Sequence, residues 1–150
     1  MRAVIQRVSE ASVCIESKIV SEIKLGILIL LGVEINDSKQ DCLWLANKIA
    51  KLRIFPDSSG KMNDSILDVD GEVILVSQFT LHAKTKNGNR PSYINSARAE
   101  QAIPIYEQFK KDLSRLICKE VFSGVFAADM KVSLINDGPV TIIIDTKNKE

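Results

Sequence analysis

The chain has 150 residues, of which 45% are hydrophobic, so we expect a single domain over 1–150 with a real core. Twenty basic and nineteen acidic residues leave a formal net charge of +1, so no global field would draw nucleic acid or a membrane onto the whole surface. The N-terminus lacks the apolar core of a signal peptide, and the longest strongly apolar stretch, 25–33, is too short to span a bilayer. We therefore expect a soluble, cytoplasmic protein with no membrane partner.

Sulfur and imidazole groups are few and scattered. Cys14, Cys42 and Cys118 lie far apart with no CxxC pair, and His82 is the only histidine, which argues against a disulfide framework or a zinc site. The aspartates of 64–70 lack the ordered glycine and terminal glutamate of a calcium loop. We expect no metal, and structural thiols, because a reactive cysteine normally needs a base beside it.

The N-terminal segment indicates strands. Alternating apolar residues predict one or two strands over 4–15 with a bend at 9–10, then a polar turn at 16–18 and a strand over 19–23. Residues 26–33 form a continuous apolar run bounded by glycines, which is typical of a central strand buried on both faces.

A helix is expected next. Asp37 or Ser38 can cap it, apolar residues recur at helical spacing to about Arg53, and Pro56 ends it. Turn-forming residues follow, and we expect 63–70 to be an irregular or partly edge-like loop.

The second half alternates strands with one long helix. A buried strand over 73–76 is followed by a polar, basic loop over 84–92, and a helix is predicted over roughly 97–117. Because Pro104 falls in its early part, its true start is expected nearer Ile103.

Three further strands are predicted over 121–126, 130–135 and 140–145, before a polar tail at 147–150. Many strands with two main helices indicate an α+β fold whose mixed sheet closes into a barrel.

Gly138 and Pro139 separate the last two predicted strands. Proline cannot donate to a strand ladder, and a Gly-Pro bond costs only about 0.5–1 kcal/mol in the cis form. A tight turn of Asn, Asp, Gly and Pro is the favoured interpretation of this segment alone, and a functional element is the alternative.

Ser77 and Thr80 lie at the end of a buried strand, where exposed backbone N–H groups can hold a developing oxyanion. Neither hydroxyl has an obvious base beyond His82, so a nucleophile activated by that histidine is a minor alternative. The simplest interpretation is that both hydroxyls satisfy the strand terminus.

Several segments together resemble the D-aminoacyl-tRNA deacylase family, over nearly the entire chain. They are MRAVIQRVSEASV, LLGVE, WLANKIAKLRIF, SQFTL, GNRPS and ADMKVSLINDGPVT. The resemblance implies a homodimeric enzyme of chiral proofreading, with a largely antiparallel, barrel-like sheet and two main helices. It would hydrolyse the ester between a D-amino acid, or glycine, and the 3′ end of tRNA, without a cofactor.

By the same resemblance, Gly138 and Pro139 form a Gly-cisPro element that enters the active site of the partner subunit. An L side chain would strike this backbone, whereas D side chains point away and glycine has none. Arg7 would hold the element in place; without the resemblance it is equally well a solvated strand arginine.

The resemblance assigns Ser77, Gln78, Phe79 and Thr80 to the pocket for the aminoacyl group. Thr80 is one candidate nucleophile. We favour assistance by the 2′-hydroxyl of the terminal ribose, with the protein supplying orientation and oxyanion stabilisation, because the chain offers no well-formed pair of nucleophile and base.

Phe126 and Met130 match the adenine pocket of the family, and the alternative is ordinary core packing. The loop with Lys84, Lys86 and Arg90 would steer phosphate, although surface lysines often serve only solubility.

Two positions depart from the family pattern. His82-Ala83-Lys84 stands where a tyrosine and then an acid are common, and Ala127 replaces a frequent glycine. Two rival functions remain: the related animal-type deacylase, which admits a small L-amino acid, and a module that binds the tRNA end without catalysis.

Overall fold

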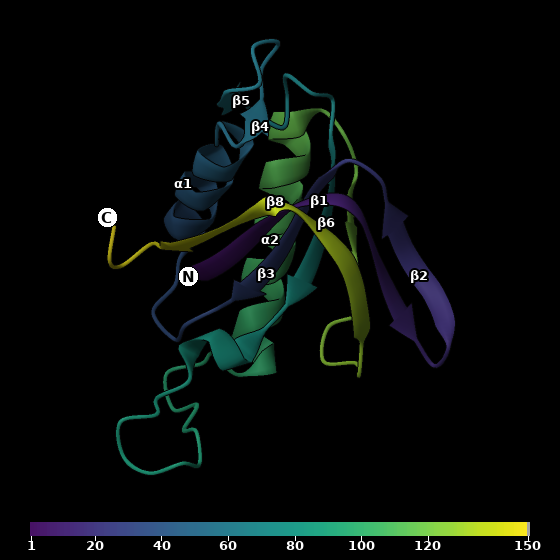
Figure 1. The fold of residues 1–150 in the computed structure, drawn as a ribbon. Coiled ribbons are helices and arrows are strands. Elements are labelled where there is room, and N and C mark those ends of the chain that lie inside the picture. The colour runs from purple at the N-terminus through teal and green to yellow at the C-terminus, as the bar shows by residue number, and fades with distance from the viewer. Residues whose placement is uncertain (150) are drawn as a thin grey trace.

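The computed structural model describes residues 1–149 as a curved mixed sheet with two helices packed against it (Figure 1). The elements, in chain order, are β1 (Arg2–Ile15), β2 (Lys18–Ile23), β3 (Gly26–Gly32), α1 (Lys39–Ala50), β4 (Phe55–Pro56), β5 (Met62–Asp64), β6 (Glu72–Ser77), the 3₁₀ helix η1 (Phe79–His82), α2 (Ala99–Ile117), β7 (Val121–Ser123) and β8 (Lys131–Asp145).

The main sheet has the strand order β2-β1-β3-β6-β7, with β8 paired to β1. All pairs made by β1 are antiparallel, whereas β3–β6 and β6–β7 are parallel. Ser21 of β2 donates to the carbonyl of Ser123 in β7 (2.7 Å), which links the two ends of the order and nearly closes a barrel. The predicted fold class is confirmed.

Both faces of β3 are buried, as its sequence predicted. Ile27, Ile29 and Leu31 join the core between the sheet and the two helices, while Leu28 joins a second core inside the curved sheet. This strand lies between β1 and β6, so it connects the part of the sheet that carries Gly138 to the part that carries Ser77.

The start of α1 follows the predicted cap. The Ser38 hydroxyl accepts from the Asp41 N–H, and the Asp41 carboxylate accepts from the Ser38 N–H, which forms a capping box. The helix ends at Ala50 and not at Arg53, because the chain becomes extended to bring the buried Phe55 into β4.

Three further segments differ from their predictions. The irregular or partly edge-like loop expected over 63–70 begins with the short strand β5, which pairs with β4, so the edge-like alternative describes its start. Helix α2 begins at Ala99 despite Pro104, since the carbonyl that loses its hydrogen bond belongs to the exposed Glu100 and is open to water. Strand β7 ends at Ser123, earlier than the predicted 121–126.

The tight turn predicted at Gly138 and Pro139 is wrong, because both flanking segments belong to the single strand β8 and pair with β1. Gln6 pairs with Thr141 and Val8 pairs with Asn136, so 137–140 bulges out of the ladder. The Gly138–Pro139 peptide bond is cis.

Within residues 1–149, no helix is both long and apolar enough to cross a membrane. The expected cytoplasmic location and the single domain over 1–150 stay predictions.

Candidate active site

A cavity of about 470 Å³ opens at the C-terminal end of β6, between η1, the start of α2 and the connection from β7 to β8. Five of the nine predicted site residues line it, namely Ser77, Gln78, Phe79, Phe126 and Met130. The other lining residues are Val76, Ala97, Ala99, Ala127, Ala128, Asp129 and Val132. Segments about fifty residues apart in the sequence therefore share one pocket.

The helix η1, which the sequence did not predict, carries one wall of this cavity. It is fastened from three sides: the Gln78 N–H donates to the Leu31 carbonyl (2.8 Å), the Ser96 hydroxyl to Phe79 O (2.9 Å), and Arg2 Nη1 to Leu81 O (2.7 Å). The first N–H groups of a helix have no carbonyl partner within it, so those of Phe79 and Thr80 are free of intrahelical bonds.

Thr80 does not line the 470 Å³ cavity. It borders a larger hollow of about 910 Å³ lined by residues of α1, β1 and β8, among them Arg2, Trp44 and Ile142. Its hydroxyl accepts a hydrogen bond from Gln78 Nε2 (2.6 Å), so the Gln78 side chain connects the two regions.

His82 provides no base for either hydroxyl. Its side chain is 5% exposed, and its buried Nε2 has no hydrogen-bond partner among the described residues. The ring packs on Gly32, where an added Cβ would lie 2.9 Å from His82 Cδ2. The nucleophile activated by this histidine is therefore not supported by the geometry.

The opposite wall is formed by Phe126 and Met130. The Phe126 ring meets Tyr106 edge-on (5.6 Å between centroids), and the Tyr106 hydroxyl donates to Leu75 O (2.9 Å), which fixes the wall to α2 and β6. Burial raises the pKa of Tyr106, so its hydroxyl stays a donor. Met130 lies directly on Gly124, where an added Cβ would be 2.2 Å from its sulfur.

Ala127 adopts a φ of +63° between these two residues. This left-handed conformation favours glycine, which explains why glycine is frequent at this position in the family that the sequence resembles. The alanine keeps the same backbone bend and adds a methyl group at the cavity.

Gly138 and Pro139 are exposed, and Arg7 fixes the bulge that carries them. Arg7 is 9% exposed; its Nη1 donates to Ile54 O (2.6 Å) and its Nε to Asp137 O (3.1 Å). Gly138 has a φ of +118°, which strains any L side chain, and an added Cβ would lie 2.7 Å from Arg7 Nη2, so a side chain here would have to displace the Arg7 guanidinium.

The bulge and the cavity lie apart within one protomer. Arg7 pairs with Ile27 near the start of β3, whereas Ser77 pairs with Leu31 near its end. Ile27 and Leu31 are four residues apart on β3, so Arg7 and Ser77 are offset by about 13 Å along the strand direction. Neither Gly138 nor Pro139 lines the cavity.

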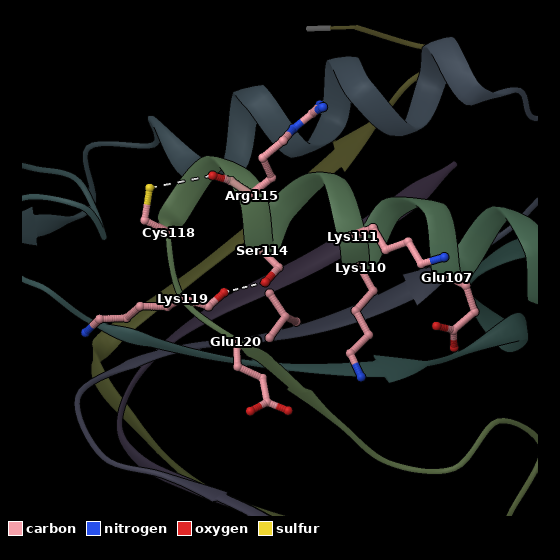
Figure 2. Close-up of a pocket in the computed structure, with 9 residues that line it drawn as sticks. Glu107, Lys110, Lys111, Ser114, Arg115, Cys118, Lys119 and Glu120 are labelled. Carbon is pink, nitrogen blue, oxygen red and sulfur yellow. Dashed lines mark hydrogen bonds between the residues drawn. The ribbon is translucent and has the colours of Figure 1, made fainter.

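Another hollow, of about 650 Å³, runs along the C-terminal half of α2 and contains no predicted site residue (Figure 2). Three of its cations already have partners: Lys110 bonds Ser123, Arg115 pairs with Asp112, and Lys119 pairs with Asp70. Because these cations are paired and Glu107 and Glu120 also line the hollow, its lining does not favour a ligand of one charge sign.

The Cys42 thiol and the spacing of possible metal ligands were both candidate features of the described part of the chain. Cys42 is buried, and burial, followed by nearby carboxylates, raises the pKa of its thiol to about 11. In residues 1–149 no three His, Cys, Asp or Glu side chains are grouped so that they could share a metal ion.

Known proteins resemble the chain over its full length. A model of the family described as D-Tyr-tRNA(Tyr) deacylase matches residues 4–145. Curated relatives named D-aminoacyl-tRNA deacylase include one from Bacteroides thetaiotaomicron, 60% identical, and one from Flavobacterium psychrophilum, 59% identical. Both alignments span 150 residues and cover the whole of each chain.

Two solved structures share the fold. One, described as c-Myc DNA Unwinding Element Binding Protein, superposes with a TM-score of 0.92 at 38% identity and covers 97% of this chain and 98% of its own. The other, a probable eukaryotic D-amino acid tRNA deacylase, has a TM-score of 0.81 over 95% of this chain and 97% of its own; at 13% identity it supports the fold alone.

The fold, the cavity and these relatives define a class of hydrolases that act on ester bonds. Within that class, the chain belongs to the D-Tyr-tRNA(Tyr) deacylase family. The resemblance found in the sequence is confirmed.

Proposed function

We propose that the protein hydrolyses the ester of D-aminoacyl-tRNA, and of glycine mischarged on tRNA(Ala), and releases free amino acid and tRNA. The observation that carries this proposal is the cavity that joins Ser77, Gln78 and Phe79 to Phe126 and Met130, in a chain about 60% identical to named deacylases. No metal or organic cofactor takes part in the proposed reaction.

The terminal adenine binds against Phe126 and Met130 in this proposal. An aromatic ring and a soft thioether suit a flat base, and the contacts of Phe126 with Tyr106 hold the ring in place before the substrate arrives. The aminoacyl ester then extends toward Ser77 and η1.

Positioning and electrostatics supply the catalysis. The free N–H groups at the start of η1, with Ser77 and Gln78 beside them, stabilise the oxyanion that forms at the ester carbonyl. The 2′-hydroxyl of the terminal ribose assists the attack, while Thr80 acts only through its hydrogen bond to Gln78.

Selectivity against L-amino acids comes from a second copy of the chain. The bulge with Gly138 and Pro139 is exposed and rigidly held by Arg7, yet it lies at the other end of β3 from the cavity of its own protomer. In a homodimer it enters the partner's cavity as a backbone barrier that an L side chain strikes.

Matched D- and L-aminoacyl-tRNA, incubated with the purified protein, test the activity. We expect D-selective release; release of a small L-residue would instead support the animal-type reaction, and binding without release would support a non-catalytic module. Thr80→Ala should leave measurable hydrolysis, and a substrate whose terminal 2′-hydroxyl is replaced by hydrogen should react hardly at all. Full activity on the deoxy substrate would contradict the proposed mechanism.

A further inference from the structure

An exposed apolar patch lies at the mouth of the active-site cavity. Phe79, which lines the cavity, is 55% exposed, and the nearby Tyr93 and Ile94 are 38% and 70% exposed. Phe79 and Tyr93 meet edge-on, with ring centroids 5.0 Å apart. Large apolar side chains gathered this openly beside a cavity are typical of a binding surface. We refer to these three residues as the aromatic step, after the two rings of Phe79 and Tyr93; Ile94 is the apolar neighbour of Tyr93 in the sequence.

We propose that the aromatic step stacks the base of the nucleotide that precedes the terminal adenosine of the tRNA. This inference rests on the proposed function and adds a second nucleotide position to it. Aromatic side chains stack any unpaired base, because every base has a π-face. A base placed on Phe79 and Tyr93 continues directly from an adenosine held in the cavity that Phe79 borders.

The step is held in place before any ligand binds. The Ser96 hydroxyl donates to the Phe79 carbonyl (2.9 Å), and the Ser96 N–H donates to the Tyr93 carbonyl (3.0 Å), so one residue holds the backbones of both aromatic residues. The Ala97 N–H then bonds the Val33 carbonyl (3.0 Å) and ties this segment to the end of β3. Such preorganisation lowers the entropic cost of binding a flexible single strand.

Charge identifies the occupant as a nucleic acid strand. Residues 83–99 contain Lys84, Lys86, Arg90 and Arg98 and no acidic residue, although the whole chain is almost neutral. Two hydrogen bonds between the backbones of Lys84 and Ser92 (2.8 and 3.0 Å) close this loop immediately before Tyr93. Each added nucleotide brings a phosphate, which these exposed cations can neutralise. Figure 1 shows the loop projecting beyond η1, away from the helices and the sheet.

The test compares two substrates, D-aminoacyl-tRNA and the minimal 3′-D-aminoacyl-adenosine, which lacks the preceding nucleotide. Tyr93→Ala should lower kcat/KM on tRNA by about ten-fold, mainly through KM, as expected for one lost stacking contact. On the minimal substrate it should change kcat/KM less than about two-fold. Tyr93→Phe, which keeps the ring, should match the wild type on both substrates.

A third substrate, a tRNA that lacks only the base before the terminal adenosine, completes a double-mutant cycle between Tyr93 and that base. The wild type should lose about ten-fold on it, and Tyr93→Ala should lose nothing further. The inference would be overturned if Tyr93→Ala lowered kcat/KM equally on tRNA and on the minimal substrate, or lowered it further on the abasic tRNA. It would also be overturned if Tyr93→Ala changed the molecular mass of the protein in solution, because Tyr93 would then act in subunit contacts. A wild-type protein that hydrolyses the minimal substrate keeps the proposed function intact in each of those cases.

Discussion

Arg7 illustrates what a single side chain decides in this protein. It lies inside β1 opposite the bulge of β8, with its guanidinium shared between Ile54 of the segment after α1 and Asp137 of the bulge. Its forked donors connect these two segments, which share no strand pairing in the described part of the chain. The sequence alone could not separate this role from that of a solvated strand arginine.

Arg7→Ala should lower the free energy of unfolding by about 1–3 kcal/mol, because the buried Ile54 carbonyl loses its donor. Arg7→Lys should recover less than half of that loss, since one ammonium cannot reach both carbonyls. Urea denaturation at pH 7 measures both variants. Arg115→Ala, at a side chain 70% exposed, is the control and should stay within about 0.5 kcal/mol of the wild type. A lysine variant as stable as the wild type would contradict this role.

Two residues that depart from the family pattern have different consequences. Ala127 keeps a left-handed backbone at φ +63° and so preserves the shape of the cavity wall. His82 is buried against Gly32, so its side chain is not part of the basic loop surface. The effect of each residue depends on the local backbone conformation and packing, which the amino-acid type alone does not predict.

At the scale of elements, the N-terminus of α1 carries a network of charges. Burial of the Asp41 carboxylate raises its pKa, but hydrogen bonds from Ser38 and Lys147, together with the charge of Lys147, outweigh burial and hold the pKa well below its usual range. A carboxyl whose pKa is lowered by folding stabilises the protein above its unfolded pKa, near 4, and loses that contribution as the pH falls.

The unfolding free energy should therefore decline below about pH 4, and Asp41→Asn should make this decline shallower. At pH 7 the same substitution should cost about 1 kcal/mol, the usual worth of a helix cap. Thermal or urea unfolding between pH 3 and pH 7 measures both effects. Asp129→Asn, at an exposed carboxylate, should differ from the wild type by less than about 0.5 kcal/mol at pH 7. An Asp41→Asn protein with unchanged stability at pH 7 would refute the cap.

At the scale of the whole molecule, the proposed site needs two copies of the chain. A heterodimer tests this, purified through two different tags after co-expression. One subunit carries Ala99→Trp, which fills its cavity but keeps its Gly138–Pro139 barrier. The other carries Pro139→Ala, which keeps its cavity but alters its barrier.

The Pro139→Ala homodimer should release L- as well as D-amino acids. In the heterodimer, the working cavity faces the intact barrier of its partner, so L-release should fall at least about ten-fold per working cavity while D-release persists. Rates of both releases per working cavity are the measurement. If the heterodimer releases L-amino acids as fast as the Pro139→Ala homodimer, the barrier acts within one subunit and the cross-subunit proposal fails.

The sequence by itself determined most elements, the buried central strand β3, the cap of α1 and the family, because these depend on local periodicity, on capping chemistry and on motifs of contiguous residues. It could not determine that two predicted strands form one bulged β8, because that depends on the register against β1. It also missed η1 and the contacts of Tyr93 and Ser96 with Phe79, which join distant segments. Tertiary structure alone placed Phe126 and Met130 across a cavity from Ser77, since only packing brings those segments together.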